Sequence, residues 1–197
     1  MLVYTLTAEE LTTASYKLAD IVLQDGFEAD LVIGVKRGGA IVAKHLFTKL
    51  SVKKEMQYTE VSFSRLTTES KKSWRVSKVL TKLPYFLLNI LRNIEVYLLE
   101  LFKPKHYFSD REHLIVLDAT LRDILSKSKK ILIVDDAVDS GKTLLAIKSV
   151  LLRENEALEI RSAVLTSTHK KSYLTVEYKL YENVLLRCPW AEDYKNE

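Results

Sequence analysis

The sequence contains few of the residues that stabilise small domains through disulfide bonds or bound metal ions. Its 197 residues contain a single cysteine, Cys188, which excludes a disulfide framework. Neither this cysteine nor the four histidines form the kind of cluster that binds zinc. A chain of this length can bury a sizeable core without such supports. We therefore expect one domain over residues 1–197.

Long apolar runs are also missing. The N-terminal segment MLVYTLTAEELTTASYKL lacks the basic start and apolar run of a secretion signal. The most apolar stretch, residues 83–102, falls short of the roughly 20 apolar residues that span a bilayer. Its interruptions are Asn89, Arg92, Asn93, Glu95 and Glu100. We therefore expect a cytoplasmic protein rather than a membrane-bound one.

The excess of positive charge is small. A net charge of +4 and a pI near 9.0 suit an anionic ligand. They are too mild to indicate a nucleic-acid partner, and none is expected.

Helix and strand patterns alternate along the chain. A capping box formed by Thr7 and Glu10 predicts a helix to about Leu23. The remaining patterns predict helices over 40–50 and 142–153, and strands over 29–35, 57–63, 131–134, 160–166 and 183–187. This alternation is typical of an α/β domain with a central, mostly parallel sheet flanked by helices.

Glycine is scarce and unevenly placed. Of the five glycines, Gly34, Gly38, Gly39 and Gly141 lie in or beside two loops, KRGG at 36–39 and DDAVDSGKT at 135–143. Glycine serves where a backbone must approach a ligand closely or adopt a positive φ. Both loops follow predicted strands, and α/β sheets bind ligands beyond the carboxyl ends of their strands. The two loops are therefore predicted to form one site.

The ending Gly-Lys-Thr of the second loop raises the question of a nucleotide-triphosphate P-loop. A P-loop needs another glycine five positions before Gly141, and that position holds Asp136. A carboxylate there would also repel the phosphate. The sequence therefore does not predict a P-loop.

The same stretch suits a different phosphate. Residues 140–143 open a predicted helix, whose backbone N–H groups would bind an anion, with the hydroxyls of Ser140 and Thr143 as further donors. The neighbouring carboxylates of Asp135 and Asp136 suit vicinal hydroxyls and Mg²⁺ instead of more phosphate. A phosphate beside a diol is the pattern of a ribose 5-phosphate.

Three segments resemble one family, the type I phosphoribosyltransferases. ILIVDDAVDSGKT at 131–143 resembles the family's signature for phosphoribosyl pyrophosphate (PRPP). FEADLVIGVKRGGAIVAKHL resembles its first strand, pyrophosphate loop and following helix, and VLLRCPWAED resembles the ending of its purine enzymes. The resemblance implies the type I fold with a small hood over about 167–197, and a cis peptide between Lys36 and Arg37.

The resemblance also implies where the ligands bind. Asp135 and Asp136 would hold the ribose hydroxyls and, through water, Mg²⁺, the expected cofactor. The pyrophosphate would bind Lys36, Arg37, Gly38 and Gly39, and the 5-phosphate would bind Asp139, Ser140, Gly141, Lys142 and Thr143. Asp139 would also be the catalytic residue that accepts the proton from N7 of a purine.

Base recognition departs from the family pattern. Lys171 stands about where the 6-oxopurine branch has a lysine for the 6-oxo group, with Lys170 as the alternative. Val184 and Leu185, followed by Leu186, occupy the region where the family stacks an aromatic ring. Adenine therefore stays open beside hypoxanthine, guanine and xanthine.

Residues 66–112 are longer than the matching region of compact family members and are predicted to be a helical insertion. A heptad-like series with one seven-residue step across Pro84, together with the preference of proline for the first turn of a helix, predicts an amphipathic helix over 84–102. The series consists of Leu80, Leu87, Leu91, Ile94, Leu98 and Leu101. We expect this helix to pack on the domain or on a second subunit, and the chain to form a homo-oligomer.

The sequence thus predicts a Mg²⁺-dependent purine phosphoribosyltransferase, a pentosyltransferase that uses PRPP and a purine base in nucleotide salvage. An adenine enzyme on the same frame is the first alternative. A regulator that binds PRPP or a nucleotide without turnover is the second. Asp139 and the acid pair argue against the regulator, because a sensor needs no proton acceptor.

Overall fold

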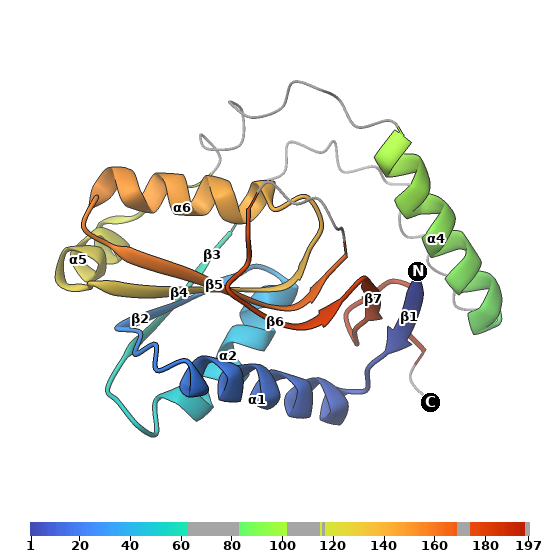
Figure 1. The fold of residues 1–197 in the computed structure, drawn as a ribbon, viewed down its shortest axis with the longest axis horizontal. Helices are drawn as coiled ribbons and strands as arrows, with labels where there is room; N and C mark the ends of the chain where they lie inside the picture. Colours follow the sequence, from blue (N-terminus) through green and yellow to red (C-terminus); the bar gives the residue numbers. More distant parts are fainter. Residues whose placement is uncertain (63–82, 102–114, 116, 169–173, 196–197) are drawn as a thin grey trace.

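The computed structural model describes residues 1–62, 83–101, 115, 117–168 and 174–195. Strands and helices alternate along most of this chain (Figure 1). In chain order the elements are β1 Leu2–Thr5, α1 Ala8–Gln24, β2 Leu31–Val35, α2 Gly38–Leu50, β3 Gln57–Val61, α4 Tyr85–Leu101, α5 Ala119–Lys127, β4 Lys130–Val138, α6 Lys142–Glu154, β5 Glu159–Ser167, β6 Tyr178–Glu182 and β7 Val184–Arg187.

The centre of the molecule is a five-stranded sheet in the order β3-β2-β4-β5-β6. Every neighbouring pair in it is parallel. A parallel sheet covered on both faces needs strands that are apolar throughout, and all five residues of β2, LVIGV, are buried. The predicted α/β class with a parallel central sheet is confirmed.

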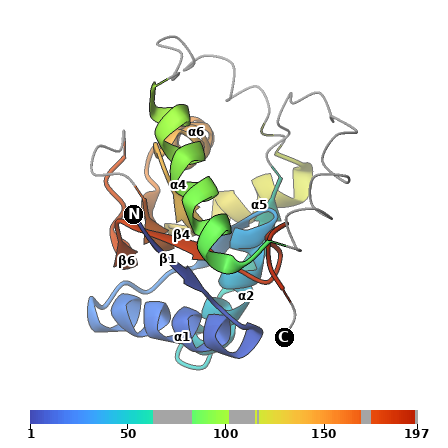
Figure 2. The ribbon, with the colours of Figure 1, turned by 90° about the vertical axis from the view of Figure 1, so that its right-hand side faces the viewer.

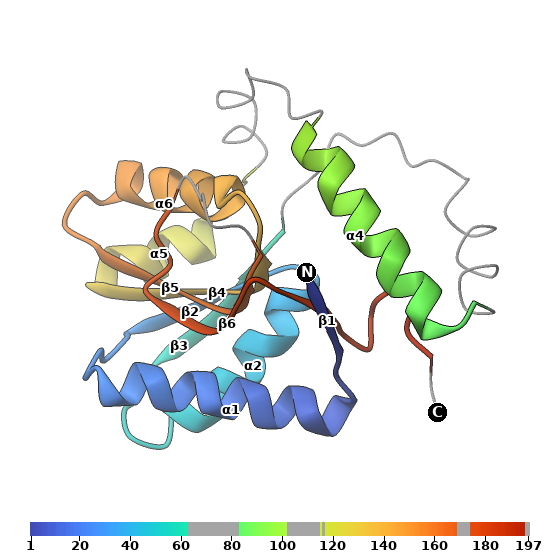
Figure 3. The same cartoon turned by 45° about the vertical axis from the view of Figure 1, so that its right-hand side comes forward.

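Helices cover both faces of this sheet, with α1 and α2 on one side and α5 and α6 on the other (Figures 1 and 3). Strand residues alternate between the two cores because successive side chains point to opposite faces. Leu132 and Val134 of β4 pack with α1 and α2, whereas Ile131 and Ile133 pack with α5 and α6. The sheet is therefore the middle layer of three.

The two ends of the described chain meet in a second, two-stranded sheet, in which β1 pairs in parallel with β7. Helix α4 lies beside this sheet (Figure 2). The Asn93 side chain accepts from the Met1 amino group at 2.6 Å and donates to the Met1 carbonyl at 3.2 Å. The first of the two alternatives for α4, packing on the domain, is thus observed.

The face on which α4 packs is not the predicted leucine stripe. Leu91 and Ile94 are 45% and 48% exposed, while Leu88, outside the stripe, is 1% exposed. Hydrogen bonds determine which face of α4 is buried. Arg92, which lies on the same face as Leu88, donates to Asp193 and to the carbonyl of Leu186. Leu91 and Ile94 of the stripe therefore do not pack on the domain, and Leu80 and the side chains of Leu98 and Leu101 lie outside the described residues.

Several other boundaries differ from the sequence prediction. Strand β4 runs to Val138 instead of ending at Val134, because β5 pairs with it as far as Val138↔Ser167. Helix α2 begins at Gly38 rather than at Ala40. Strands β1 and β6 and helix α5 were not predicted, whereas the capping box at Thr7 is confirmed. Most of the 66–112 insertion lies outside the described residues.

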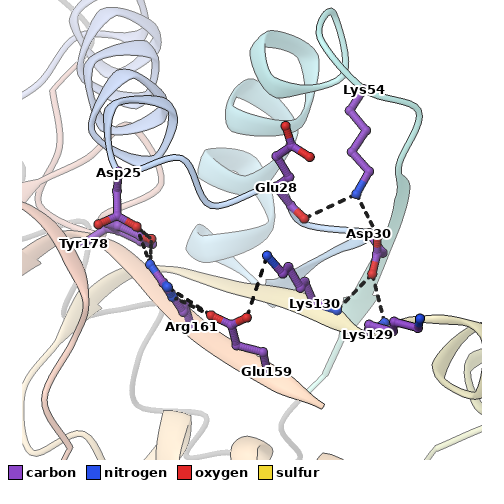
Figure 4. Close-up of polar contacts among 9 residues, drawn as sticks. All are labelled: Asp25, Glu28, Asp30, Lys54, Lys129, Lys130, Glu159, Arg161 and Tyr178. Carbon is purple, nitrogen blue, oxygen red and sulfur yellow. Dashed lines mark hydrogen bonds and ion pairs between the residues drawn. The ribbon is translucent and has the colours of Figure 1, made fainter. Parts of the chain in front are cut away.

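Polar contacts close the edge of the sheet where its strands begin (Figure 4). Asp30 accepts from Lys54 Nζ at 2.8 Å and from the backbone N–H groups at the start of β4. Arg161 binds Asp25 and the hydroxyl of Tyr178, which in turn donates to Asp25 at 2.7 Å. Burial, followed by the Asp25 contact, raises the pKa of Tyr178 to about 12. This edge is tied together internally, so the ligand site is to be sought at the opposite edge.

Among the residues the structure describes, no helix is both long enough and apolar enough to cross a membrane.

Candidate functional site

The two predicted loops lie at the carboxyl ends of neighbouring strands. Strands β2 and β4 pair in parallel, and the chain leaves them toward opposite faces of the sheet, into α2 and into α6. In an open parallel sheet, a crevice for ligands forms where the connections diverge in this way. The fold therefore places KRGG and DDAVDSGKT side by side at the expected ligand edge (Figure 3).

Two helix N-termini meet at this edge. Helix α2 follows Arg37, and helix α6 follows Gly141, whose φ of 77° is left-handed and suits glycine. Neither cap residue makes a side-chain hydrogen bond to its own helix. The exposed Lys36 and Arg37 add positive charge beside the first of them. Helix starts of this kind favour anions, so the edge can hold two separate phosphate groups.

Gly38 and Gly39 bring α2 into contact with the acid pair. A Cβ built on Gly38 would lie 2.3 Å from Asp136 Oδ2, and one on Gly39 would lie 2.6 Å from the Cα of Asp135. Real Cβ contacts do not reach these distances, so a side chain at Gly38 would displace Asp136, and one at Gly39 would collide with the backbone of β4. The Lys36–Arg37 peptide before them is cis, as the family resemblance implied.

Gly39→Ala is expected to lower the free energy of unfolding by about 1–3 kcal/mol, the usual cost of overpacking. The new methyl group would press on the backbone of Asp135 and Val134, which cannot rotate away as a side chain could. Thermal or urea unfolding would measure this loss. Gly26→Ala, strained by its φ of 75° but with no atom within 4 Å of the new Cβ, is the control that changes backbone strain without overpacking. Parent-like stability of Gly39→Ala would contradict the close approach.

Asp135 and Asp136 lie on strand β4 itself, half-buried, rather than in the loop after it. The backbone N–H of Asp136 donates to Asp135 Oδ1 at 2.9 Å, and Trp190 Nε1 donates to Asp136 Oδ2 at 3.2 Å. These contacts orient both carboxylates on a rigid strand. Adjacent carboxylates fit Mg²⁺, which proteins commonly hold through one or two carboxylates, several waters and substrate phosphates. Within the described residues, three or more His, Cys, Asp or Glu side chains do not gather anywhere as a metal site.

Asp139 lies beyond the end of β4 and is exposed. The hydroxyl of Thr168, a residue 3% exposed just after β5, donates to Asp139 Oδ1. The backbone N–H of Thr168 also bonds to the carbonyl of Val138 at 2.9 Å. Asp139 is therefore held at the rim of the site while remaining accessible. Ser140 follows Asp139, and Lys142 and Thr143 begin α6; all three are half-buried.

An acidic residue, Glu60, lies beside the lysines of the site and was not predicted from the sequence. Glu60 of β3 forms ion pairs with Lys44 Nζ at 3.0 Å and with Lys36 Nζ at 3.6 Å. Hydrogen bonds from Lys44 and from the Tyr58 hydroxyl hold the pKa of Glu60 below its usual value. The sequence shows only that Tyr58 and Glu60 lie on the same face of a predicted strand. It does not show that Glu60 lies near Lys36, because that depends on the pairing of β2 with β3.

The predicted base-binding residues divide into two groups. Lys170 and Lys171 lie outside the described residues. Val184 and Leu185 lie on β7, where Leu185 is 9% exposed and Val184 half-buried. The carbonyl of Val184 accepts from Thr166 Oγ1 at 2.7 Å, so β7 lies beside the end of β5, the strand that precedes Thr168. The structure thus brings β7 near the loop of Asp139.

Comparison with known families decides the assignment. Residues 7–191 match the family model of the phosphoribosyl transferase domain. The chain belongs to this family. The match spans both loops, the acid pair and Trp190, and the three-layer architecture is the type I phosphoribosyltransferase fold.

Solved structures with this fold cover nearly the whole chain. A purine phosphoribosyltransferase from Pyrococcus horikoshii Ot3 aligns with a TM-score of 0.58 and 21% identity, over 100% of this chain and 99% of that one. Xanthine-guanine-hypoxanthine phosphoribosyltransferase from Helicobacter pylori aligns with a TM-score of 0.56 and 15% identity, over 93% and 91%. A hypothetical protein from Neisseria gonorrhoeae with bound ppGpp aligns with a TM-score of 0.55 and 17% identity, over 96% and 89%. At these identities the likeness shows the fold alone, and no curated protein sequence matched.

Proposed function

We propose that this chain is a purine phosphoribosyltransferase, which transfers ribose 5-phosphate from PRPP to a purine and releases pyrophosphate. The observation that carries the proposal is the meeting of two helix N-termini at one sheet edge, with Asp135 and Asp136 between them. PRPP has the matching layout, with a phosphate, a diol and a pyrophosphate in that order. We place the reaction in the cytoplasm, as a step of nucleotide salvage.

The binding roles follow from the charges. The start of α6, from Asp139 to Thr143, receives the 5-phosphate through its N–H groups and the hydroxyls of Ser140 and Thr143. The start of α2, with Lys36 and Arg37, receives the pyrophosphate. Asp135 and Asp136 accept hydrogen bonds from the ribose hydroxyls. Bound at this carboxylate pair, Mg²⁺ would neutralise charge on the departing pyrophosphate.

The chemical step is a displacement at C1 of the ribose. A ring nitrogen of the base forms the new bond to C1, and the C1–oxygen bond to pyrophosphate breaks with its electron pair leaving on oxygen. Arg37 and the N–H groups of α2 stabilise the charge that develops there. Asp139, oriented by Thr168, accepts the proton that the purine loses.

We favour a purine over a pyrimidine because the family resemblance gives Asp139 the role of proton acceptor for purine N7. The Pyrococcus horikoshii relative is a purine enzyme and the Helicobacter pylori relative a xanthine, guanine and hypoxanthine enzyme, which supports the same class. We propose a 6-oxopurine, with Lys171 donating to the 6-oxo group and Val184 and Leu185 covering the base. Adenine, and Lys170 in place of Lys171, remain the alternatives.

Pyrophosphate release tests the proposal directly. The protein would be mixed with Mg²⁺ and PRPP and, in turn, with adenine, hypoxanthine, guanine, xanthine, orotate or uracil. We expect rapid release with hypoxanthine, guanine or xanthine and slow release with the pyrimidines. Release with adenine alone would shift the assignment to an adenine enzyme, and release with orotate or uracil alone would overturn the purine assignment.

A nucleotide-binding regulator is the second candidate. It is favoured by one observation, that the Neisseria gonorrhoeae protein with this fold holds ppGpp. A regulator would bind PRPP or a nucleotide tightly and release no pyrophosphate with any base. The same assay, combined with a binding titration, therefore separates the two candidates.

We propose a homo-oligomer in which the outer face of α4 contacts a second subunit. Phe86, Ile90, Ile94 and Tyr97 are 63%, 52%, 48% and 62% exposed, and their spacing puts them on one side of the helix. Ile90→Glu with Ile94→Glu should shift the protein to a smaller species in light scattering, because a carboxylate does not bury in such a contact. Lys17→Glu, on the exposed side of α1, is the control. An unchanged mass in the double variant would contradict the proposal.

A further inference from the structure

A buried charge network joins α4 to the C-terminal turn, residues 188–194. Asp193 accepts from Arg92 Nε at 3.0 Å, from Arg92 Nη2 at 2.7 Å and from Arg187 Nε at 2.9 Å. The Arg187 and Asp193 side chains are only 1% and 9% exposed. The remaining donors of Arg187 reach Thr5 Oγ1 and Asn89 Oδ1, both at 2.9 Å, so the second of these contacts also comes from α4.

The same turn reaches the acid pair at its other end. Trp190 lies three residues before Asp193 and donates its indole N–H to Asp136 Oδ2 at 3.2 Å. Backbone bonds from Ala191 N to the Cys188 carbonyl at 2.9 Å, and from Tyr194 N to the Ala191 carbonyl at 3.0 Å, make the turn compact. A displacement at Asp193 would therefore be passed to Trp190.

The start of α2 confirms how tightly this end is packed. A Cβ built on Gly38 would lie 2.7 Å from Trp190 Nε1 and 2.3 Å from Asp136 Oδ2. The indole, the carboxylate and the proposed pyrophosphate loop thus meet at one point. The carboxylate of Asp136 has one orientation here because the indole N–H holds one of its oxygens.

Desolvating two arginines and an aspartate is costly, and such pairs add little net stability compared with apolar packing. What a buried, fully paired network can supply is a single geometry. Arg92 contributes a fork of three donors, to both oxygens of Asp193 and, at 3.0 Å, to the Leu186 carbonyl. The network therefore fixes the position of the turn relative to α4.

We propose that Arg92, Asp193 and Arg187 are positioning residues that hold Trp190 against Asp136, so that helix α4 controls the affinity of the acid pair for Mg²⁺ and PRPP. This inference rests on the proposed function for its ligand. Its structural half, the coupling of Arg92 to Trp190, is independent of the proposed function.

The structural half is tested without any ligand. In a Trp74→Phe background Trp190 is the sole tryptophan. Arg92→Gln should increase the quenching of its fluorescence by acrylamide, because the turn loses its anchor on α4. Arg122→Gln makes the same change at an arginine of α5 whose side chain is 61% exposed, and this matched control should leave quenching unchanged. Equal quenching in the parent and in Arg92→Gln would overturn the proposal.

The functional half is tested by a double-mutant cycle on the affinity for PRPP in the presence of Mg²⁺. Trp190→Phe removes the indole N–H that donates to Asp136 while keeping an aromatic ring, and it should weaken binding about 10-fold, as expected for a lost hydrogen bond to a charged group. Arg92→Gln should weaken binding to a similar extent while leaving the KM for the base unchanged. The double variant should bind no more weakly than the weaker single variant, because both act through one contact. Losses that multiply would overturn the proposal.

Two results keep the inference separate from the function. Altered quenching in Arg92→Gln, with no binding of PRPP by the parent, would support the coupling and reject the proposed function. If Arg92→Gln does not fold, Arg92→Lys keeps the charge and removes the fork, and the same two measurements apply. Parent-like quenching and affinity in that variant would overturn the proposal.

Discussion

Asp139→Asn should lower turnover about 10²–10⁴-fold, the usual share of a general base. The amide has the shape of the carboxylate but cannot accept the proton that the purine loses. The affinity for PRPP should stay close to that of the parent, because the backbone N–H groups and hydroxyls that bind the 5-phosphate are untouched, as is the acid pair. Pyrophosphate release and a PRPP titration measure the two effects separately.

Two further variants are needed to interpret the effect of Asp139→Asn. Asp20→Asn makes the same change at the ion pair between Asp20 of α1 and Lys49 of α2, outside the proposed site, and its turnover should equal that of the parent. Thr168→Val removes the hydroxyl that Asp139 accepts, and should reproduce part of the loss in turnover without a change in PRPP affinity. Full turnover in Asp139→Asn would remove Asp139 from the mechanism.

Asp135→Ala combined with Asp136→Ala should weaken binding of PRPP with Mg²⁺ at least about 100-fold. Each carboxylate makes hydrogen bonds to ribose hydroxyls or to metal-bound water, and each such contact to a charged group contributes about 1.5–3 kcal/mol. Both side chains are half-buried and belong to neither apolar core, so their removal leaves both cores intact. We therefore expect the double variant to fold, and isothermal titration to show the loss.

Asp123→Ala is the control for this pair, because Asp123 is 63% exposed in its ion pair with Lys127. Titrating the parent without Mg²⁺ shows how much of the affinity depends on the metal. The double variant and the metal-free parent should lose affinity to a similar degree if the acids act with the metal. Unchanged affinity in the double variant would refute the assignment of Asp135 and Asp136 to the ribose.

The sequence indicated the candidate site well where the site is local. Asp135, Asp136 and Asp139 stand within five consecutive residues, and Lys36 to Gly39 are contiguous, so a single strand-to-helix turn brings each group together. Their chemistry follows from residue type and from the rule that parallel strands bind ligands at their carboxyl ends. No folded structure was needed to place these residues at one edge.

The contacts that orient those residues could not be predicted in this way. Trp190 and Asp136 are 54 residues apart, and Thr168 and Asp139 are 29 apart. Glu60 reaches Lys36 only because β3 is the neighbour of β2. A contact between side chains of two different elements produces no periodic pattern in the sequence of either element.

Helix α4 shows the same limit in the fold. Its apolar spacing predicted a helix, and a helix is present, but the stripe of Leu91 and Ile94 faces outward. The orientation depends on Arg92, whose partner Asp193 is 101 residues away. A charged residue in a helical pattern is normally predicted to face solvent, but Arg92 instead joins α4 to Asp193.

The sequence by itself determined the alternation of strands and helices, the two glycine-containing turns and the acids beside them, because each depends on residues close together in the chain. Only the tertiary structure decided which face of α4 is buried, how far β4 continues, and which donors hold Asp136 and Asp139. Those features depend on hydrogen bonds and packing between segments that meet only after the sheet has formed, so their free energies belong to the assembled molecule rather than to any one segment.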